Sequence, residues 1–417
     1  MSIAKRIRDL LEKHGKPARE VYFDLENSGF VPDEVVEYMK PYFNKHGYGH
    51  PSITHKVGWE ALETVYETKE LVSKTIGSPN PESIVFTHSG TEANNLAILG
   101  CLFNKKNRSG SGKKVVVSAI EHLSVIFPAR FASELLGFKV QYVPVDENGF
   151  VDPEVLKYYV DRDTVLVSIQ TVNHEIGTIQ KVKELVDVVK SANPRALFHT
   201  DAVDAYGWIP IDVEELNVDM LSISSHKIHG PRGVGVLYVK EHVELEPPIR
   251  GQLSSEKLWP GVENVPLIAG FKRAVEIAFR NFEYRVEYVK SIRDKLMDGI
   301  LNSVPDVIVN GPRGDMRVAN NVNVSFLYVE GEALTVELSM HGVYVSSGSA
   351  CTSRILEPSH VLLAIGRKHE EAHGSILFKL SQFHTVEDVD YALEVVPKAV
   401  ERLRAISPLA QRKSART

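Results

Sequence analysis

The sequence predicts an α/β protein, with a large domain built on a mostly parallel seven-stranded sheet and a smaller α+β domain at the C-terminal end. Between residues 60 and 280, short apolar runs alternate with helical stretches. The runs are rich in branched side chains and show little polar alternation, as expected of strands that helices cover on both faces. From residue 304 onward the pattern changes to fewer strands and one long final helix, which indicates a second domain.

Seven runs supply the strands of the predicted sheet. Each is short, apolar and followed by polar or Gly-rich residues, and helical stretches separate them along the chain. In chain order they are SIVFTH at 83–88, KVVVSAI at 114–120, KVQYVPV at 139–145, TVLVSIQT at 164–171, ALFHTDA at 196–202, DMLSISS at 219–225 and GVGVLYV at 233–239.

The remaining elements flank this sheet in the sequence. A helical period extends over 264–303, and its length leads us to expect one break. The smaller domain is expected to have strands at 318–326, 342–347 and 375–381 and a final helix from near Val386. The expected domains are an amphipathic N-terminal helix, a large ligand-binding domain and a small C-terminal domain against which N-terminal residues are candidates to pack, at 1–20, 21–280 and 281–417.

Composition and charge narrow the classes of function. The 417 residues are 43% hydrophobic and 24% charged, with a formal net charge of −6, as in an ordinary globular protein. Nucleic-acid and membrane-surface proteins favour a strongly basic patch or tail, so we expect neither kind of partner. No apolar run reaches the roughly 18 residues that span a bilayer, and charges interrupt the apolar N-terminal stretches, unlike a secretory signal. The basic, Gly/Ser-rich stretch 105–114 is expected to be a surface turn.

The two cysteines, Cys101 and Cys351, are too few for a disulfide framework in a chain of this length. No Cys/His cluster has the spacing of a zinc site, so we expect no metal. We expect a cytoplasmic location.

Chemically useful side chains follow five of the predicted strands. The carboxyl ends of parallel strands lie at one edge of a sheet, and ligands bind there. We therefore expect these side chains to share one crevice. They are His88 to Thr91, His122, Asn173 with His174, Asp201, and Ser224 to Lys227.

Lys227 is the central candidate. It stands between a buried strand and a Gly-rich turn, where a lysine forms a Schiff base with an aldehyde cofactor if burial or a neighbouring cation keeps its amine neutral. The alternative is a surface lysine in a loop. Asp201, on the preceding strand, favours the first interpretation, because pyridoxal phosphate (PLP) needs a carboxylate against its ring nitrogen to act as an electron sink. Taken alone, Asp201 would be a strand-end cap.

Gly90 and Thr91 open a helix after the first strand. Gly90 allows close approach of the backbone, Thr91 offers a hydroxyl, and the helix N-terminus offers free N–H groups, so the segment is a candidate phosphate cradle. A simple helix cap is the alternative. His122 is a candidate to stack on the cofactor ring and relay protons, although a lone histidine is more often structural.

Cys351 lies in a small, polar segment, Ser-Ser-Gly-Ser-Ala-Cys-Thr-Ser. A thiol there is expected to be exposed and to act as a nucleophile. Cys101 lies within the apolar helix LAILGCLF and is expected to be an inert, buried thiol.

From residue 20 to residue 410 the chain resembles the cysteine desulfurases, a family within class V of the fold-type I PLP enzymes. The resemblance rests on motifs in matching order and spacing, of which SSGSACTS and HKIHGPRG are the most specific. The motifs are SGTEANNLAI, the EH of AIEHLSV, HTDAV, SSHKIHGPRGVG, PGVENVP, VSSGSACTS and LEPSHVLLAIG.

The resemblance implies the fold-type I architecture and a homodimer with its active site near the subunit interface. It implies that Lys227 holds PLP, Asp201 pairs with the ring nitrogen and His122 stacks on the ring. Gly90, Thr91, Ser224 and His226 would serve the phosphate.

The implied reaction converts L-cysteine to L-alanine. Cysteine would displace Lys227 from the cofactor, Lys227 would remove the α-proton, and the Cys351 thiolate would take the sulfur as a persulfide. The persulfide would pass to an acceptor, either an iron–sulfur scaffold or a tRNA-thiolation protein.

Two positions depart from the family beside the cofactor's 3′-oxygen. The family usually has Asn at the position of His174 and Gln at the position of Asp204. A carboxylate would repel the phenolate form of the cofactor, and a protonated His174 would compensate, which is a hypothesis that the spectral pKa of His174→Asn tests. Near the phosphate, Trp259 and Val262 replace an Arg and a Thr.

The substrate pocket departs further. The family binds the substrate carboxylate with an Arg where this chain has Leu377, and loss of such a charged hydrogen bond typically costs about 2–3 kcal/mol. Lys379 would share a strand face with Leu377 and would substitute as a point charge. Asn27, in the reshaped segment Asn-Ser-Gly, is the second candidate for the substrate.

Three hypotheses follow. The first is a PLP-dependent cysteine desulfurase. The second is a related lyase or sulfur transferase whose substrate is selenocysteine or a carboxyl-modified cysteine. The third is a degenerate, non-catalytic subunit, which Leu377, Val262 and Asp204 keep open.

Overall fold

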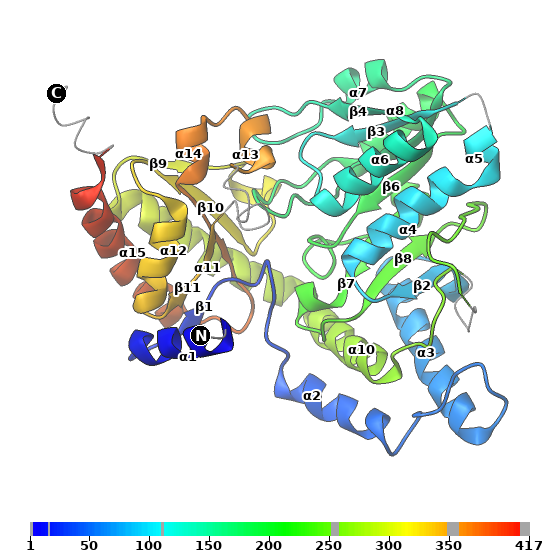
Figure 1. The fold of residues 1–417 in the computed structure, drawn as a ribbon, viewed down its shortest axis with the longest axis horizontal. Coiled ribbons are helices and arrows are strands. Elements are labelled where there is room, and N and C mark those ends of the chain that lie inside the picture. The colour runs from blue at the N-terminus through cyan, green and yellow to red at the C-terminus, as the bar shows by residue number, and fades with distance from the viewer. Residues whose placement is uncertain (1–2, 16, 110–111, 252–257, 348–357, 409–417) are drawn as a thin grey trace. The chain divides into compact units, whose positions relative to one another are not determined.

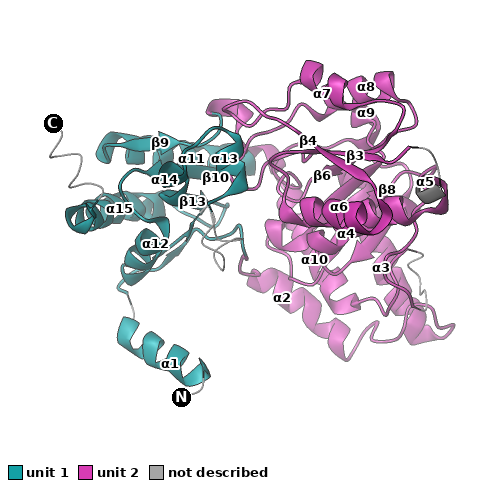
Figure 2. Cartoon of the chain, turned by 45° about the horizontal axis from the view of Figure 1, so that its top comes forward, with its two compact units in different colours: residues 1–27, 285–312, 319–417 teal, residues 28–284, 313–318 magenta. Residues whose placement is uncertain are grey.

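The computed structural model describes residues 3–15, 17–109, 112–251, 258–347 and 358–408. It divides into two compact units (Figure 2). Unit 1 comprises residues 1–27, 285–312 and 319–417, and unit 2 comprises residues 28–284 and 313–318.

Unit 2 contains a seven-stranded sheet whose strand order is β2-β8-β7-β6-β5-β3-β4 (Figure 1). The five strands from β7 to β4 are mutually parallel, whereas β8 is antiparallel to both of its neighbours. The predicted mostly parallel, seven-stranded α/β fold is therefore confirmed. The strands are β2 (Ile84–Thr87), β3 (Lys114–Ser118), β4 (Lys139–Val143), β5 (Thr164–Ser168), β6 (Leu197–Asp201), β7 (Met220–Ser224) and β8 (Gly235–Val239).

Both faces of this sheet are covered, because every residue of β3, β7 and β8 is buried. Helices α4 (Gly90–Phe103) and α6 (Leu123–Leu136) pack against each other and supply much of one apolar core. Burying a branched or aromatic side chain stabilises a fold by about 1.5–3 kcal/mol, so continuous apolar runs are what this architecture requires.

The strand ends of unit 2 define one edge. Because β8 is antiparallel to both β2 and β7, β2 runs in the same direction as β7 and the other parallel strands. The segments after β2, β3, β5, β6 and β7 therefore leave the sheet at the same edge, where ligands bind in open α/β folds.

The other helices of unit 2 connect these strands. The stretch 105–114 is not wholly a turn, because it begins with a short helix and ends in β3, where the buried Lys114 pairs with Asp161 over 2.5 Å. The helices are α2 (Asp33–Met39), η1 (Lys40–Phe43), α3 (Lys56–Thr75), η2 (Pro81–Ser83), α5 (Lys105–Ser109), α7 (Pro153–Tyr159), α8 (Val182–Ala192), α9 (Val213–Leu216), η3 (Ser225–Ile228), α10 (Val265–Phe279) and η4 (Gly314–Met316).

Unit 1 has a four-stranded antiparallel sheet in the order β12-β13-β10-β9 and a parallel pair, β1-β11. The strands are β1 (Val21–Tyr22), β9 (Val307–Val309), β10 (Asn321–Phe326), β11 (Val343–Tyr344), β12 (Ser346–Ser347) and β13 (Ser375–Lys379). The helices are α1 (Ile3–His14), α11 (Phe282–Ser303, which begins just before the unit), α12 (Gly331–Met340), α13 (His360–Ala364), α14 (His369–His373) and α15 (Val386–Ile406).

The expected break in the 264–303 helix lies between α10 and α11, where Asn281 has φ 53°. A residue in the left-handed region ends a right-handed helix, and asparagine tolerates this conformation. Among the described residues, no helix combines the length and apolar character that crossing a membrane requires.

Candidate active site

Lys227 lies in η3, directly after the central strand β7. Its ammonium contacts both carboxylate oxygens of Asp204 at 3.3 Å, and only 8% and 7% of the two side chains are exposed. The sequence places this lysine at the correct edge, and the structure buries it against a carboxylate.

The turn that carries Lys227 is fixed by its backbone. Ser225 N–H donates to Val234 O, and Gly230 N–H donates to Ser225 O at 3.0 Å. A Cβ on Gly230 would lie 2.1 Å from Ser225 Oγ, so only glycine fits there. His229 takes a left-handed φ of 61°. A tight turn of this kind holds Lys227 in place at the edge of the sheet.

Asp201 ends β6 and is held by two donors. Val203 N–H donates to Oδ1 at 3.0 Å, and Asn94 Nδ2 donates to Oδ2 at 2.7 Å. Burial raises the pKa of the Asp201 carboxyl, while the nearby His122 acts in the opposite direction. A cationic ring nitrogen bound to this carboxylate would offset the cost of burying it.

Asn94 joins Asp201 to His122 through Ser124. The Asn94 amide donates to Ser124 Oγ at 2.8 Å, and Ser124 Oγ lies 2.7 Å from His122 Nδ1. Asn94 and Ser124 lie in two of the motifs that carry the family resemblance, SGTEANNLAI and AIEHLSV, but neither was predicted to be a site residue. Their position two to four residues after a site residue at a helix start is the signal that could have identified them.

His122 is the N-cap of α6, and its Nδ1 accepts from Ser124 N–H at 3.1 Å. A neutral imidazole that accepts at Nδ1 carries its proton on Nε2. The ring meets His174 edge-on, with centroids 5.0 Å apart and an interplanar angle of 79°. His174 is buried, and its Nε2 lies 3.7 Å from Glu175. The two histidines therefore lie together at the strand edge.

The N-terminus of α4 has the form of an anion cradle. Ser89 caps the helix by accepting from Glu92 N–H, and Gly90 is the first helical residue. A Cβ on Gly90 would lie 2.8 Å from Val203 Cγ2 and 3.2 Å from Ser224 Cβ. A side chain at this position would collide with Val203, so glycine lets the N-terminus of α4 pack closely against the end of β7 and the segment after β6.

Ser224 and His226 complete this corner. Ser224 ends β7, and its Oγ lies 2.8 Å from His226 Nδ1. Burial, followed by the charge of Lys227, lowers the pKa of His226 to about 4. His226 is therefore a neutral hydrogen-bonding group at neutral pH, not a second cation.

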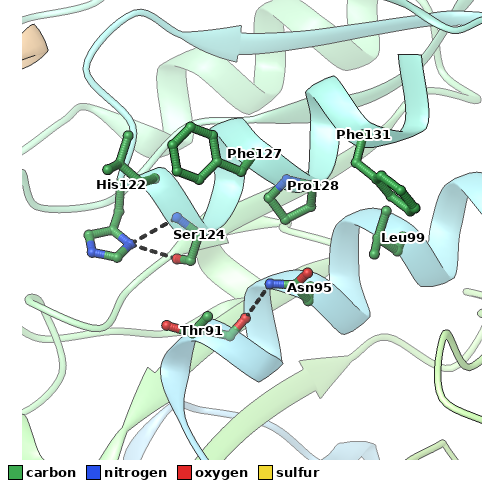
Figure 3. Close-up of a pocket in the computed structure, with 9 residues that line it drawn as sticks. Thr91, Asn95, Leu99, His122, Ser124, Phe127, Pro128 and Phe131 are labelled. Carbon is green, nitrogen blue, oxygen red and sulfur yellow. Dashed lines mark hydrogen bonds between the residues drawn. The ribbon is translucent and has the colours of Figure 1, made fainter. Parts of the chain in front are cut away.

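A cavity of about 400 Å³ opens between α4 and α6 (Figure 3). Its polar end is formed by Thr91, His122 and Ser124, and Figure 3 shows the His122 ring turned toward Ser124. Its other end is apolar, with Phe127 and Phe131 partly exposed. The cavity adjoins the predicted cofactor residues on α4 and α6.

The substrate candidates belong to unit 1. Lys379 ends β13, is 2% exposed and pairs with Glu26 at 3.1 Å. Leu377 is also buried, and it lies on the same face of β13 as Lys379 because the two are two residues apart in the strand. Asn27 is exposed and donates to Asp24 at 2.7 Å. The ammonium expected to bind a substrate carboxylate is thus already close to a carboxylate of its own chain.

Cys101 is fully buried, and burial raises the pKa of its thiol to about 12, which makes it an unreactive thiol as expected. Cys351 lies outside the described residues.

Two further positions lie near the strand edge. Trp259 is buried in the apolar core of α4 and α6, and its Nε1 donates to His88 Nδ1 at 3.4 Å. Val262 is 62% exposed. Trp259 therefore packs in a core instead of offering a charge.

A family model described as aminotransferase class-V matches residues 21–392. Cysteine desulfurase IscS 1 of Archaeoglobus fulgidus is 44% identical over 391 residues, which cover 94% of this chain and 100% of that protein. The chain belongs to the cysteine desulfurase family, within class V. This family is PLP-dependent, so the predicted cofactor is confirmed at the level of the family.

Other relatives agree with this family. Cysteine desulfurase IscS of Dictyoglomus turgidum is 44% identical over 94% of this chain and 98% of its own. The mitochondrial cysteine desulfurase of Drosophila melanogaster is 41% identical over 97% of this chain and 86% of its own.

Two solved structures agree with the fold. A structure named NifS-like protein has a TM-score of 0.85 at 35% identity and covers 92% of this chain and 100% of its own. SspA in complex with cysteine has a TM-score of 0.75 at 32% identity and covers 87% of this chain and 99% of its own.

The residues of unit 2 fit PLP. Gly90 is the first residue of α4, and a helix N-terminus binds anions such as a phosphate. Lys227 is an amine for the aldehyde, and Asp201 is a buried carboxylate for the ring nitrogen. The three groups come from separate strand ends of one edge, which is how α/β folds assemble ligand sites.

Proposed function

We propose that the chain is a PLP-dependent cysteine desulfurase that converts L-cysteine to L-alanine and passes the sulfur to Cys351 as a persulfide. The observation that supports this most is the placement of Lys227, Asp201 and His122 at one strand edge in unit 2, in a chain of this family.

The bound cofactor would supply an electron sink for the α-carbon of an amino acid joined to its aldehyde carbon. Asp201 would hold the ring nitrogen, fixed in turn by Asn94 and the Val203 N–H. Lys227 would attach the cofactor and move the α-proton. His122 would lie against the ring with its proton on Nε2, available for transfer.

The phosphate would be held at the start of α4. Gly90 and Thr91 present backbone N–H groups and a hydroxyl, and Ser224 and His226 add two neutral hydrogen-bonding side chains. Asp204 and His174 would face the cofactor's 3′-oxygen. The N–H groups at a helix N-terminus point toward a bound anion, and the helix dipole favours its negative charge. Neutral hydrogen-bond donors beside them add further hydrogen bonds to the phosphate.

Substrate binding by Lys379 and Asn27 stays a proposal. Lys379 has Glu26 beside it, so a substrate carboxylate would compete with Glu26 for the ammonium. This observation favours a second candidate function, in which the substrate is a cysteine whose carboxylate is masked. Selenocysteine, the other alternative substrate, keeps its carboxylate and gains no support from this contact.

Partners and location are also proposals. We propose a homodimer that delivers sulfur to an iron–sulfur scaffold or a tRNA-thiolation protein, in line with relatives named cysteine desulfurase IscS. A cytoplasmic location stays the sequence-based proposal, although one relative is named as mitochondrial.

The deciding experiment measures alanine and sulfide released from L-cysteine by PLP-loaded protein with a thiol reductant. We expect sustained turnover in the wild type and a fall of at least about 100-fold in Cys351→Ala, because removal of a covalent nucleophile leaves only the remaining catalysis. Cys101→Ala is the matched control and should keep its turnover, since that thiol is buried.

Equal turnover in Cys351→Ala and the wild type would contradict the persulfide step. A visible cofactor band without alanine release would reject L-cysteine as the substrate and direct the assay to selenocysteine and to cysteine esters or amides.

A further inference from the structure

The nitrogen of Lys227 lies in a buried ion pair. Asp204 places both of its oxygens 3.3 Å from Nζ, and each side chain is less than a tenth exposed. Opposite charges at this separation and burial interact far more strongly than on a surface, because little water screens them. Whatever bonds the lysine nitrogen forms, a cationic nitrogen is favoured beside this carboxylate.

Of the nearby charged groups, Asp204 is the one placed to stabilise a cationic nitrogen on Lys227. Asp201, the other carboxylate, is held by Asn94 and the Val203 N–H. Near His226, the charges of Lys227, Arg232 and His122 all lower its pKa, and that of Asp204 raises it. Arg232 and a protonated His122 or His226 would oppose a positive charge on the lysine, and His174, beside His122, lies next to Glu175.

Attachment of the cofactor conserves this charge. The amine of Lys227 attacks an aldehyde in its neutral form, so the ammonium first releases a proton, which ends on the leaving oxygen. Over the whole reaction a C=N bond forms, the aldehyde oxygen leaves as water with two of the three ammonium hydrogens, and one hydrogen stays on nitrogen. The charge is therefore +1 before and after the reaction. If the nitrogen then lost that last proton, the buried Asp204 carboxylate would lose the cation that lies 3.3 Å from it, which is costly.

We propose that Asp204 is a positioning residue that keeps the nitrogen of Lys227 protonated in its bond to the cofactor, so that the protonated form persists to higher pH than it would beside a neutral side chain. This inference rests on the proposed function only in requiring that Lys227 binds PLP. Asp204 stands where the family usually has Gln. The carboxylate would keep the C=N bond between Lys227 and the cofactor in its protonated form, which an incoming amine attacks more readily.

The test is a pH titration of the visible absorption of the purified holoprotein. A carboxylate within 4–6 Å shifts a titration midpoint by about 1–3 pH units, so Asp204→Asn and Asp204→Gln should move the midpoint of the visible band down by at least about one unit. Asp204→Glu keeps the charge and should stay within about half a unit of the wild type. The Gln variant carries the residue usual in the family, which guards against a variant that fails to fold.

A midpoint that is the same in the wild type and in Asp204→Gln overturns the proposal, as does an equal fall in Asp204→Glu. The result of this titration can be distinguished from the result of the turnover assay. A shifted midpoint in a protein that releases no alanine from cysteine supports the role of Asp204 while rejecting the proposed substrate. Absence of any visible band in PLP-treated wild type rejects both.

Discussion

Lys379 and Glu26 form an ion pair that is nearly all buried in unit 1. Removing water from both charges is expensive, and their attraction repays that cost only while both are present. Removal of either charge is therefore expected to destabilise unit 1, because the attraction between the two offsets the cost of burying them. This is a structural role, whether or not the ammonium also meets a substrate.

We expect Lys379→Met and Glu26→Gln each to lower the free energy of unfolding by about 3 kcal/mol, because each removes one member of a buried ion pair. The double variant should lose less than the sum of the two. Urea unfolding of the four proteins measures this. Strictly additive losses would show that the two side chains do not depend on each other.

At the scale of residues, the sequence predicted the positions of the chemistry better than their contacts. Lys227, Asp201 and His122 were predicted at one strand edge and lie there. The pairing of Lys227 with Asp204 was not predicted, because the two are 23 residues apart and only the turn after β6 brings them together. The pairing of Lys379 with Glu26 joins opposite ends of the chain, and no local pattern encodes it.

Among the elements, α4 shows how one position sets a ligand site. The helix begins at Gly90, where a Cβ would lie 2.8 Å from Val203 Cγ2 and 3.2 Å from Ser224 Cβ. A helix N-terminus attracts anions that approach it closely. The absence of a side chain at this residue therefore lets the helix end lie directly beside the end of β7, within the proposed site.

Gly90→Ala should weaken PLP binding by at least about 10-fold and lower the free energy of unfolding by about 1–3 kcal/mol, because the added methyl group would lie 2.8 Å from Val203 Cγ2 and would displace the start of α4. Equilibrium dialysis or fluorescence of cofactor-free protein measures the affinity. Gly100→Ala, on the same helix and next to Leu245 Cβ at 3.3 Å, is the control and should leave affinity unchanged. Equal affinities for PLP in Gly90→Ala and wild type would place the phosphate elsewhere.

The strands of unit 2 were largely predictable, because a strand that is buried on both faces consists of a continuous apolar run. All seven strands of unit 2 fall within the predicted runs, and the helical break falls inside 264–303. β9, Val-Ile-Val, was missed although it is apolar and branched, because a run of three residues is shorter than the strands that an apolar run predicts. Helix α5 was missed because its basic and polar composition is that of a turn.

For the molecule as a whole, buried neutral histidines set the response to acid. Burial lowers the pKa of His199 to about 3, and the ring bridges Ser168 and Ser222 in the sheet of unit 2. An unfolded histidine titrates near 6.5. Between these values the unfolded chain binds one more proton than the folded one, so stability is complete above pH 6.5 and falls as the pH falls.

From pH 7 to pH 5, His199 should cost the protein about 2 kcal/mol of unfolding free energy. His199→Asn lacks the titrating group and should lose about 2 kcal/mol less over that range, even if it is less stable at pH 7. Urea midpoints at the two pH values measure the difference. Parallel pH dependence in the variant and the wild type would remove His199 as the source.

The placement of β8 between β2 and β7 also orders events during synthesis. Roughly 150 residues separate the end of β2 from the start of β8, and a ribosome adds about 5–20 residues per second. For about 7–30 seconds the nascent chain therefore carries β2 without its only sheet neighbour. Gly90, which follows β2, and Ser224, which precedes β8, meet only after the last strand has emerged. If Gly90 and Ser224 hold the cofactor's phosphate as proposed, a growing chain binds the cofactor only after the sheet of unit 2 is complete.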